Sequence, residues 1–294
     1  MKESRSEYLD VRGVRFHLRT WGNPSAPKLF LTHGWWDMSA SWQFVVDSLQ
    51  HDWHVIAPDW RGHGLTQADP GNMHQFNNNL ADLDRILHHY SPDEPVRIGA
   101  HSMSFNVASV YAGVKPERVA RLVNVDCYGF RKVAPEDALG RFRMWLKTFE
   151  EEAEERTYDS LEKFAERLIR QAVHLTPERA LFLAQHLLRQ RRDGKYTLSA
   201  APALRDPARL LIYLGGIRLA EAMAIWRHVT APVLWISAVD SGTREQIGAT
   251  EEEIAERKAC FANLTYRPIR NAGHMVHQEQ PEELAAVMEE FFLQ

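Results

Sequence analysis

The chain has 294 residues, of which 45% are hydrophobic, and a formal net charge of −4 at pH 7. This length and apolar content are typical of one large domain, or of one domain with an insertion. The slight acidic excess argues against a nucleic-acid-binding protein. No apolar run reaches the length of a membrane span. The polar N-terminus lacks the apolar segment of a secretory signal peptide.

Two cysteines, Cys127 and Cys260, stand far apart and without CxxC or Cys/His spacing. Such a pair indicates neither a zinc site nor a disulfide framework. Two reduced thiols are typical of a cytoplasmic protein. We therefore expect a cytoplasmic location, no metal and no membrane partner.

Short β-prone segments alternate with amphipathic helical segments over most of the chain. In chain order, the predicted strands cover residues 14–21, 28–32, 52–57, 96–100, 121–125, 233–238 and 264–269. A last helix begins at Pro281, because proline is favoured in the first turn and an apolar stripe follows it. This alternation predicts an α/β fold whose mainly parallel sheet has helices on both faces.

Residues 131–219 interrupt this rhythm, because they contain helical patterns and no convincing strand. Asp159-Ser160-Leu161-Glu162 resembles a capping box, and Thr176-Pro177-Glu178 is typical of a helix start. We therefore expect a core of residues 1–130 and 220–294 with an all-helical insertion at 131–219.

Ser102 lies between a predicted strand and a predicted helix, in the stretch Gly99-Ala100-His101-Ser102-Met103-Ser104. Small residues two positions to either side, Ala100 and Ser104, suit a sharp and strained turn that would expose the serine Oγ above the sheet. A seryl hydroxyl is a weak nucleophile until a base removes its proton. Ser102 is therefore a candidate nucleophile only if a base and an orienting acid follow it.

Both partners occur downstream. Asp240 follows the strand at 233–238, and His274 follows the strand at 264–269 in Asn271-Ala272-Gly273-His274. Because the carboxyl ends of parallel strands share one sheet edge, the three side chains can meet there. Asp126 also follows a predicted strand and is the alternative acid.

The order Ser102, Asp240, His274 resembles the α/β-hydrolase superfamily, in its serine hydrolase-like or esterase branch. His33-Gly34-Trp35-Trp36 and the turn Asp59-Trp60-Arg61-Gly62-His63-Gly64 add to the resemblance. The resemblance implies a helical cap at 131–219. It also implies an oxyanion hole formed by the backbone N–H groups of Trp35 and Met103. Trp36, Trp42 and Trp145 are candidates for an apolar substrate pocket, with core packing as the alternative.

The chain departs from the family at two positions after the nucleophile, where Ser104 and Phe105 replace the usual glycines. Serine is small enough to keep the turn, whereas Phe105 must find room beside it. These replacements could shift the oxyanion-hole geometry and lower the rate, or leave a protein that binds its substrate but turns it over slowly.

The resemblance favours a serine hydrolase that cleaves carboxylic esters of small or medium apolar substrates through an acyl-enzyme on Ser102, without a cofactor. A cofactor-independent dioxygenase of the heteroaromatic hydroxy-quinolone type is the alternative, because Asp126 and the Trp60–Gly64 turn are similar to that group. A non-enzymatic binding protein is a third hypothesis. We expect a small-molecule substrate as partner, and a homodimer is left open.

Overall fold

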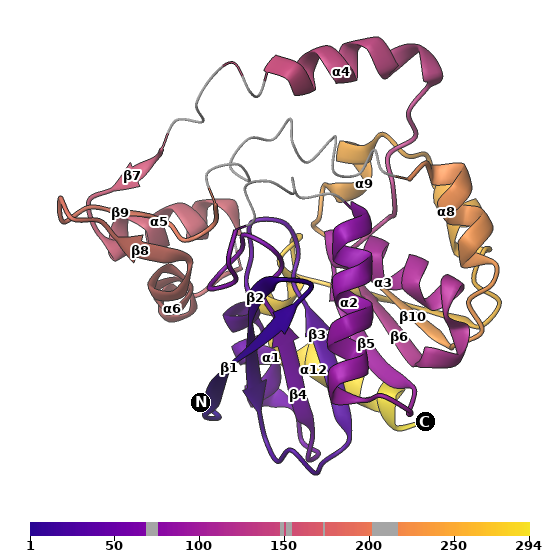
Figure 1. Cartoon of the computed structure of the whole chain (residues 1–294), viewed down its shortest axis with the longest axis horizontal. Helices are drawn as coiled ribbons and strands as arrows, with labels where there is room; N and C mark the ends of the chain where they lie inside the picture. Colours follow the sequence, from indigo (N-terminus) through magenta and orange to yellow (C-terminus); the bar gives the residue numbers. More distant parts are fainter. Residues whose placement is uncertain (69–75, 148–149, 151–154, 173, 202–216) are drawn as a thin grey trace.

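The computed structural model describes residues 1–68, 76–147, 150, 155–172, 174–201 and 217–294. Its centre is an eight-stranded sheet in the order β1-β2-β4-β3-β5-β6-β10-β11 (Figure 1). The pairs from β4 to β11 are parallel, while β2 pairs antiparallel with both β1 and β4. The strands are β1 (Ser4–Val11), β2 (Val14–Trp21), β3 (Lys28–Thr32), β4 (His54–Pro58), β5 (Val96–His101), β6 (Val119–Val125), β10 (Val233–Ala238) and β11 (Leu264–Ile269).

Helices cover both faces of the sheet, as predicted, because alternate strand residues point to opposite sides. Phe30 and Ile98 belong to a cluster with α2 (Phe76–Tyr90), α3 (Met103–Val114) and α8 (Leu219–Trp226). Leu29 and Leu31 belong to a second cluster with α1 (Gln43–Ser48) and α12 (Pro281–Leu293). The remaining core helices are η1 (Ser39–Trp42), η2 (Pro116–Arg118), α9 (Thr243–Ile247), α10 (Glu251–Lys258) and α11 (Val276–Glu279). No helix in the described part of the chain is both long and apolar enough to cross a membrane.

The predicted strands agree closely with the sheet. β2, β3, β10 and β11 have the predicted bounds, and β4, β5 and β6 differ at their ends by one or two residues. β1 was not anticipated, because this edge strand is polar and largely exposed. It forms a hairpin with β2 through Arg12 and Gly13, both of which have positive φ angles, as tight hairpin turns require.

The predicted insertion, residues 131–219, is not all-helical among its described residues. It holds η3 (Pro135–Asp137), α4 (Ala138–Lys147), α5 (Leu161–Gln171) and α6 (Pro177–Leu187). It also holds a three-stranded sheet of β7 (Thr157–Tyr158), β9 (Tyr196–Leu198) and β8 (Leu188–Gln190). The prediction was wrong because strands of two or three residues are too short to show a period of two. The predicted insertion also includes 148–149, 151–154, 173 and 202–216, which lie outside the described residues.

α5 and α6 begin where the sequence predicts, each capped by a hydroxyl. Ser160 Oγ accepts a hydrogen bond from the amide of Lys163, so the cap lies one residue after Asp159. Thr176 caps α6 in the same way, with Pro177 as the first helical residue. Both helices therefore start at the side-chain caps that their sequences favour.

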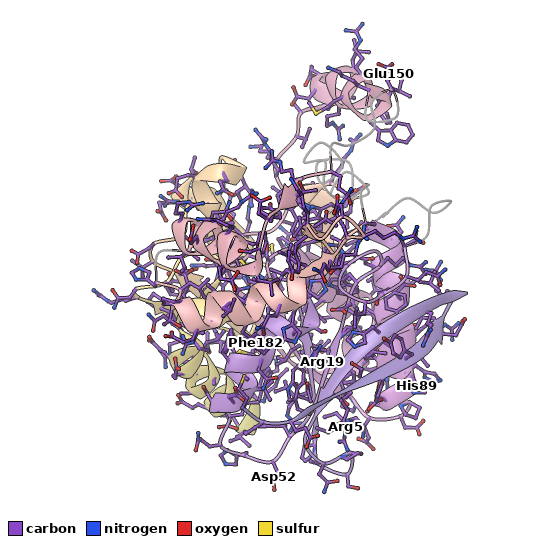
Figure 2. The ribbon with its side chains drawn as sticks, turned by 90° about the vertical axis from the view of Figure 1, so that its left-hand side faces the viewer. Arg5, Arg19, Asp52, His89, Glu150 and Phe182 are labelled. Atoms are coloured by element: carbon purple, nitrogen blue, oxygen red, sulfur yellow. The ribbon has the colours of Figure 1, made fainter. Side chains whose placement is uncertain are left out.

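α6 and the loop before it connect the insertion to the core. The guanidinium of Arg179 forms an ion pair with Glu282 of α12 and donates to the carbonyl of Gln278. Phe182 meets Phe44 of α1 edge to face, with ring centroids 5.2 Å apart. By contrast, α4 projects away from the sheet, near the labelled Glu150 in Figure 2. Among the described residues, α6 and the loop before it therefore attach the insertion to α1 and α12.

Candidate active site

Ser102 forms a sharp turn between β5 and α3. Its backbone has φ 54° and ψ −124°, a region that non-glycine residues rarely adopt. The turn is held because Ser102 N donates to the carbonyl of Val125 at 3.0 Å, and Phe105 N donates to the carbonyl of Ser102 at 3.0 Å. Strain of this kind is typical of functional positions.

His274 lies between Ser102 and Asp126. Its Nε2 is 2.9 Å from Ser102 Oγ, and its Nδ1 is 2.8 Å from Asp126 Oδ2. A carboxylate only accepts hydrogen bonds, so Nδ1 carries the proton and Nε2 is free to accept the seryl proton. The three side chains therefore have the contacts of a nucleophile, a base and an orienting acid.

The structure pairs His274 with Asp126 and not with Asp240, the acid that the sequence favoured. Asp240 is half-exposed, and its Oδ2 lies 3.3 Å from Nε2 of His174 in the insertion. The chain turns after β10, since Asp240 N donates to the carbonyl of Ala272, and the two hydroxyls that follow Asp240 reach Asp126 instead. The alternative acid, Asp126, is the one in contact with the imidazole.

Asp126 is fully buried and has four hydrogen-bond partners. Its Oδ1 accepts from the amide of Ala238 at 3.0 Å. Its Oδ2 accepts from Ser241 Oγ at 2.6 Å and from Thr243 Oγ1 at 3.2 Å, besides His274. Thr243 Oγ1 also lies 3.0 Å from His274 Nδ1. These donors compensate for the removal of the carboxylate from water.

Sequence reasoning missed Ser241 and Thr243 as parts of the site. Both follow β10, at the sheet edge where the acid was expected, and both contact Asp126. Their positions after a buried strand, in Ser241-Gly242-Thr243, were the available signal. A hydroxyl after a strand is compatible with many roles, so the donation to Asp126 could be identified only from the three-dimensional contacts.

Ser104 and Phe105, the residues that replace the usual glycines, both fit the turn. Ser104 is fully buried, and its Oγ forms a short hydrogen bond to the carbonyl of His33. Nε1 of Trp60 donates to Ser104 Oγ at 2.8 Å and to the same carbonyl at 2.9 Å. Phe105 packs against Trp235, with centroids 5.6 Å apart. Ser104 thereby ties the loop after β3 to the start of α3.

The expected oxyanion donors lie at the two segments that flank Ser102. A Cβ atom on Gly34 would lie 3.0 Å from Cβ of Ser102, so the loop leading into Trp35 passes directly beside the serine. Met103 is the first residue of α3, where an amide has no partner within the helix. Both segments thus lie beside Ser102, and the oxyanion hole stays a prediction.

The three tryptophans proposed for the substrate pocket differ in their surroundings. Trp42 has no exposed surface and packs in the core, 4.8 Å from the ring of His277, so it cannot line an open pocket. Trp145 lies on the projecting α4 and meets Phe142 of the same helix, at 6.4 Å. Trp36 is 43% exposed and follows the loop beside Ser102. Trp42 is therefore ruled out as a pocket residue, whereas Trp36 and Trp145 stay predictions.

His101 contacts both the backbone and the ring of His274. Its Nε2 donates to the backbone carbonyl of His274 at 2.8 Å, and the two rings are 4.7 Å apart. Burial holds the pKa of His101 well below its usual value, and the nearby imidazoles of His277 and His274 add to this effect. Burial therefore favours the neutral form of His101.

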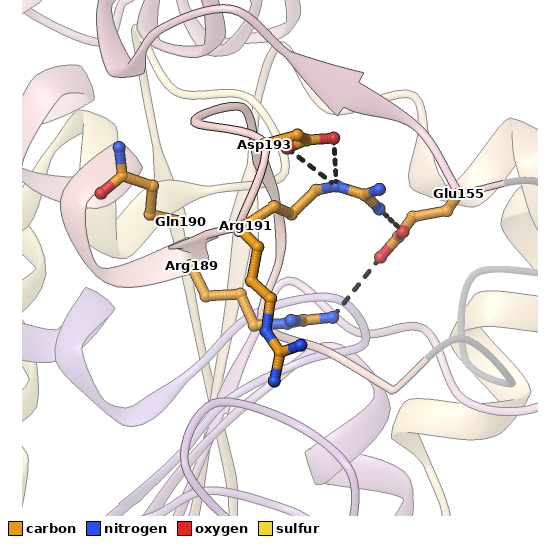
Figure 3. A pocket seen from close by; sticks show the side chains of 6 residues that line it. Glu155, Arg189, Gln190, Arg191 and Asp193 are labelled. Atoms are coloured by element: carbon orange, nitrogen blue, oxygen red, sulfur yellow. Dashed lines mark hydrogen bonds and ion pairs between the residues drawn. The ribbon is translucent and has the colours of Figure 1, made fainter.

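A pocket of about 440 Å³ lies in the insertion, at the turn between β8 and β9 (Figure 3). Its arginines are largely engaged in ion pairs: Arg189 and Arg191 both contact Glu155, and Arg191 also contacts Asp193 at 3.2 Å. None of the residues around it belongs to the Ser102 site. The pocket is thus lined by side chains that form surface ion pairs with one another.

A family model described as the alpha/beta hydrolase family matches residues 29–287, so the chain belongs to that family. A "Serine hydrolase-like protein" of Danio rerio is 26% identical over 308 residues, which covers 99% of this chain and 89% of the relative. The solved structure of a thioesterase domain from the curacin biosynthetic pathway has a TM-score of 0.85 at 21% identity. The similarity covers 97% of this chain and 99% of the thioesterase chain.

A more local similarity joins the chain to "1H-3-hydroxy-4-oxoquinoline 2,4-dioxygenase" of Pseudomonas putida. The two are 41% identical over 65 residues, which is 22% of this chain and 25% of the relative. The likeness therefore covers one part of the fold.

Proposed function

We propose that this member of the alpha/beta hydrolase family cleaves carboxylic esters of small to medium apolar substrates through an acyl-enzyme on Ser102. The observation that carries the proposal is the position of one imidazole, 2.9 Å from Ser102 Oγ and 2.8 Å from Asp126 Oδ2. The similarity to a serine hydrolase-like protein over nearly the whole chain supports it.

In the first step, Ser102 Oγ attacks the ester carbonyl while His274 Nε2 takes its proton. The tetrahedral oxyanion is stabilised by the amides of Trp35 and Met103, a contribution of about 3–4 kcal/mol for one such donor in related sites. His274 then protonates the departing alcohol, and the acyl group stays on Ser102. Asp126 keeps the imidazole in the required tautomer and stabilises the imidazolium.

In the second step, water attacks the acyl carbonyl as His274 takes one of its protons. The carboxylic acid leaves, and Ser102 Oγ recovers its proton. Because Asp126 and His274 already meet before substrate binds, this relay needs no large rearrangement. The same chemistry applies to thioesters, which makes them a second set of substrates to assay.

A fluorophosphonate probe tests the proposal, since it reacts irreversibly with an activated serine. We expect stoichiometric labelling of Ser102 and hydrolysis of p-nitrophenyl acetate and butyrate. Both should be lost in Ser102→Ala and His274→Ala and kept in the surface control Ser25→Ala. If the probe and the esters leave the folded wild-type protein untouched, the proposal is wrong.

A second candidate is a cofactor-independent dioxygenase, favoured by the local similarity to the Pseudomonas putida enzyme. In this reading, the pair of His274 and Asp126 removes a proton from a hydroxy-quinolone, and the substrate anion reacts with oxygen. Oxygen uptake with 3-hydroxy-4-quinolone that survives Ser102→Ala and is lost in His274→Ala would favour it. Absence of uptake together with Ser102 labelling would exclude it.

A further inference from the structure

Asp37, His101 and His277 form a buried cluster directly behind the candidate triad. They come from three places in the chain: the loop after β3, the end of β5 and the short helix α11. Each offers one nitrogen or oxygen atom, and these three atoms all lie within 4.8 Å of one another. The side chains are no more than 3% exposed.

Each residue of the cluster keeps a buried polar atom without a hydrogen-bond partner among the described residues. These atoms are Oδ1 of Asp37, Nδ1 of His101 and Nδ1 of His277. Buried polar atoms are rarely left unpaired, because each costs free energy when it is removed from water. Oδ1 of Asp37 and Nδ1 of His101 are acceptor atoms, so a cation is a suitable partner for them.

Two hydrogen bonds to residues outside the cluster are of the kind that orients metal ligands: that of His101 to His274 and that of Ser41 to Asp37. His101 donates through Nε2 to the carbonyl of His274, so its Nδ1 presents a lone pair. Asp37 Oδ2 accepts from Ser41 Oγ at 2.9 Å and lies 2.9 Å from Nε2 of His277. Ligating imidazoles commonly donate their second N–H to a carbonyl, and ligating carboxylates are themselves hydrogen-bonded.

We infer that Asp37, His101 and His277 bind a divalent transition-metal ion such as Zn²⁺. Two imidazoles and one carboxylate are a favourable donor set for this class of ion and a poor one for Ca²⁺ or Mg²⁺. Zn²⁺ holds nitrogen and oxygen ligands at about 2.0–2.2 Å. Nε2 of His277 and Oδ2 of Asp37 lie 2.9 Å apart, so the ion would take the place of the proton that they share, with Nδ1 of His101 as the third ligand.

The ion would inhibit the reaction proposed above, and this consequence rests on that proposal. His101, one of the ligands, lies against the ring of His274 and holds its carbonyl. An ion on Nδ1 of His101 would fix this ring, and the hydrogen bond from Nε2 of His101 to the carbonyl of His274 would pass any shift of the ring on to the base of the triad. The ion belongs to a control site beside the triad and takes no part in the bond-making steps.

Binding is tested first, without reference to activity. Zn²⁺ is titrated into the metal-free full-length protein by calorimetry, and Co²⁺ binding is followed by visible absorption. We expect about one tight site per chain and the intense visible bands of four-coordinate Co²⁺. Asp37→Asn and His277→Gln should each weaken Zn²⁺ binding at least about tenfold.

The matched controls are Asp240→Asn and His174→Gln, which alter an exposed Asp–His pair 3.3 Å apart. They should leave the tight site unchanged. Equal loss in the controls, or weak Co²⁺ bands from six-coordinate surface binding alone, would overturn the inference. Circular dichroism checks that the buried variants fold. If either fails to fold, the wild-type Co²⁺ spectrum and stoichiometry decide the matter.

Activity gives a separate readout. Zn²⁺ should inhibit wild-type ester hydrolysis and should inhibit Asp37→Asn at least about tenfold less potently. Tight Zn²⁺ binding by a protein with no esterase activity would refute the proposed function and still support the metal site. Undiminished inhibition of Asp37→Asn would place the inhibitory ion elsewhere and refute this site.

Discussion

At the scale of single residues, the environment of Asp126 decides which carboxylate can assist His274. Asp126 is buried with four hydrogen-bond partners, whereas Asp240 is half-exposed beside His174. A buried carboxylate with fixed donors is held in one orientation, and an exposed one is free to rotate and is screened by water. The acid role is therefore proposed for Asp126.

Asp126→Asn should reduce kcat for p-nitrophenyl butyrate by about 10⁴-fold, because an amide favours the wrong imidazole tautomer. Asp240→Asn is the matched control and should change kcat less than about threefold, as expected for an exposed ion pair. Steady-state kinetics on the two folded variants measure this. The reverse pattern would return the acid role to Asp240.

Ser241 and Thr243 orient the carboxylate through hydroxyl donors. Hydrogen bonds to a charged group contribute about 1.5–3 kcal/mol, so Ser241→Ala should lower kcat by about tenfold or more. Thr243→Val should act in the same direction. Ser241→Thr, which keeps a hydroxyl, should recover most of the rate. If Ser241→Ala turns over like the wild type, the hydroxyl has no positioning role.

At the scale of elements, α12 holds the loop between α1 and β4 through one buried side chain. The carboxylate of Glu289 accepts from the amides of Gln50 and His51 and from Nε1 of Trp53, each at about 2.9 Å. Burial alone would raise the pKa of Glu289, but these donors lower it below its usual value. The carboxylate is thus favoured in its charged form.

Glu289→Gln should lower the free energy of unfolding by about 1–3 kcal/mol, because the amide turns one acceptor into a donor that faces backbone N–H groups. Glu290, the adjacent exposed residue, provides the control: Glu290→Gln should change the free energy of unfolding by less than about 0.5 kcal/mol. Urea unfolding at pH 7 compares the two. Equal values would show that the loop does not depend on Glu289.

At the scale of the whole molecule, Asp59 joins segments that are distant in the chain. Its carboxylate lies 2.7 Å from Nδ1 of His17 on β2 and accepts from the amides of Ser39 and Leu65. Burial alone would raise the pKa of Asp59, but the hydrogen bond and charge of His17, with the other donors, lower it to about 2. Folding therefore favours the ionised form.

Because the pKa of Asp59 is lower in the folded protein, its ionised carboxylate stabilises the fold at pH values above the unfolded pKa of about 3.9. This stabilisation is lost as the pH falls through about 2, the pKa of Asp59 in the folded protein. At pH 6, Asp59→Asn should cost on the order of 2 kcal/mol of unfolding free energy. The difference from wild type should shrink between pH 4 and 2. Asp93→Asn, at an exposed position, is the control. A difference independent of pH would contradict the charge-based account.

The repeated pattern of the core made much of the fold predictable. Buried strands such as 233–238 are mostly apolar, so their positions could be predicted from the run of apolar residues. Ser102 and His274 were identifiable because each follows a strand in a small-residue turn. Cytoplasmic location and a homodimer are still predictions from sequence.

The sequence by itself determined the α/β class, the strand order along the chain and the candidate nucleophile and base, because these depend on local periodicity and turn chemistry. The tertiary structure alone decided between Asp126 and Asp240, since both follow strands and differ only in where the chain turns next. It also placed Trp42 in the core and brought Asp37, His101 and His277 together. Contacts between residues 37, 101 and 277 arise from packing across the sheet, which no local pattern encodes.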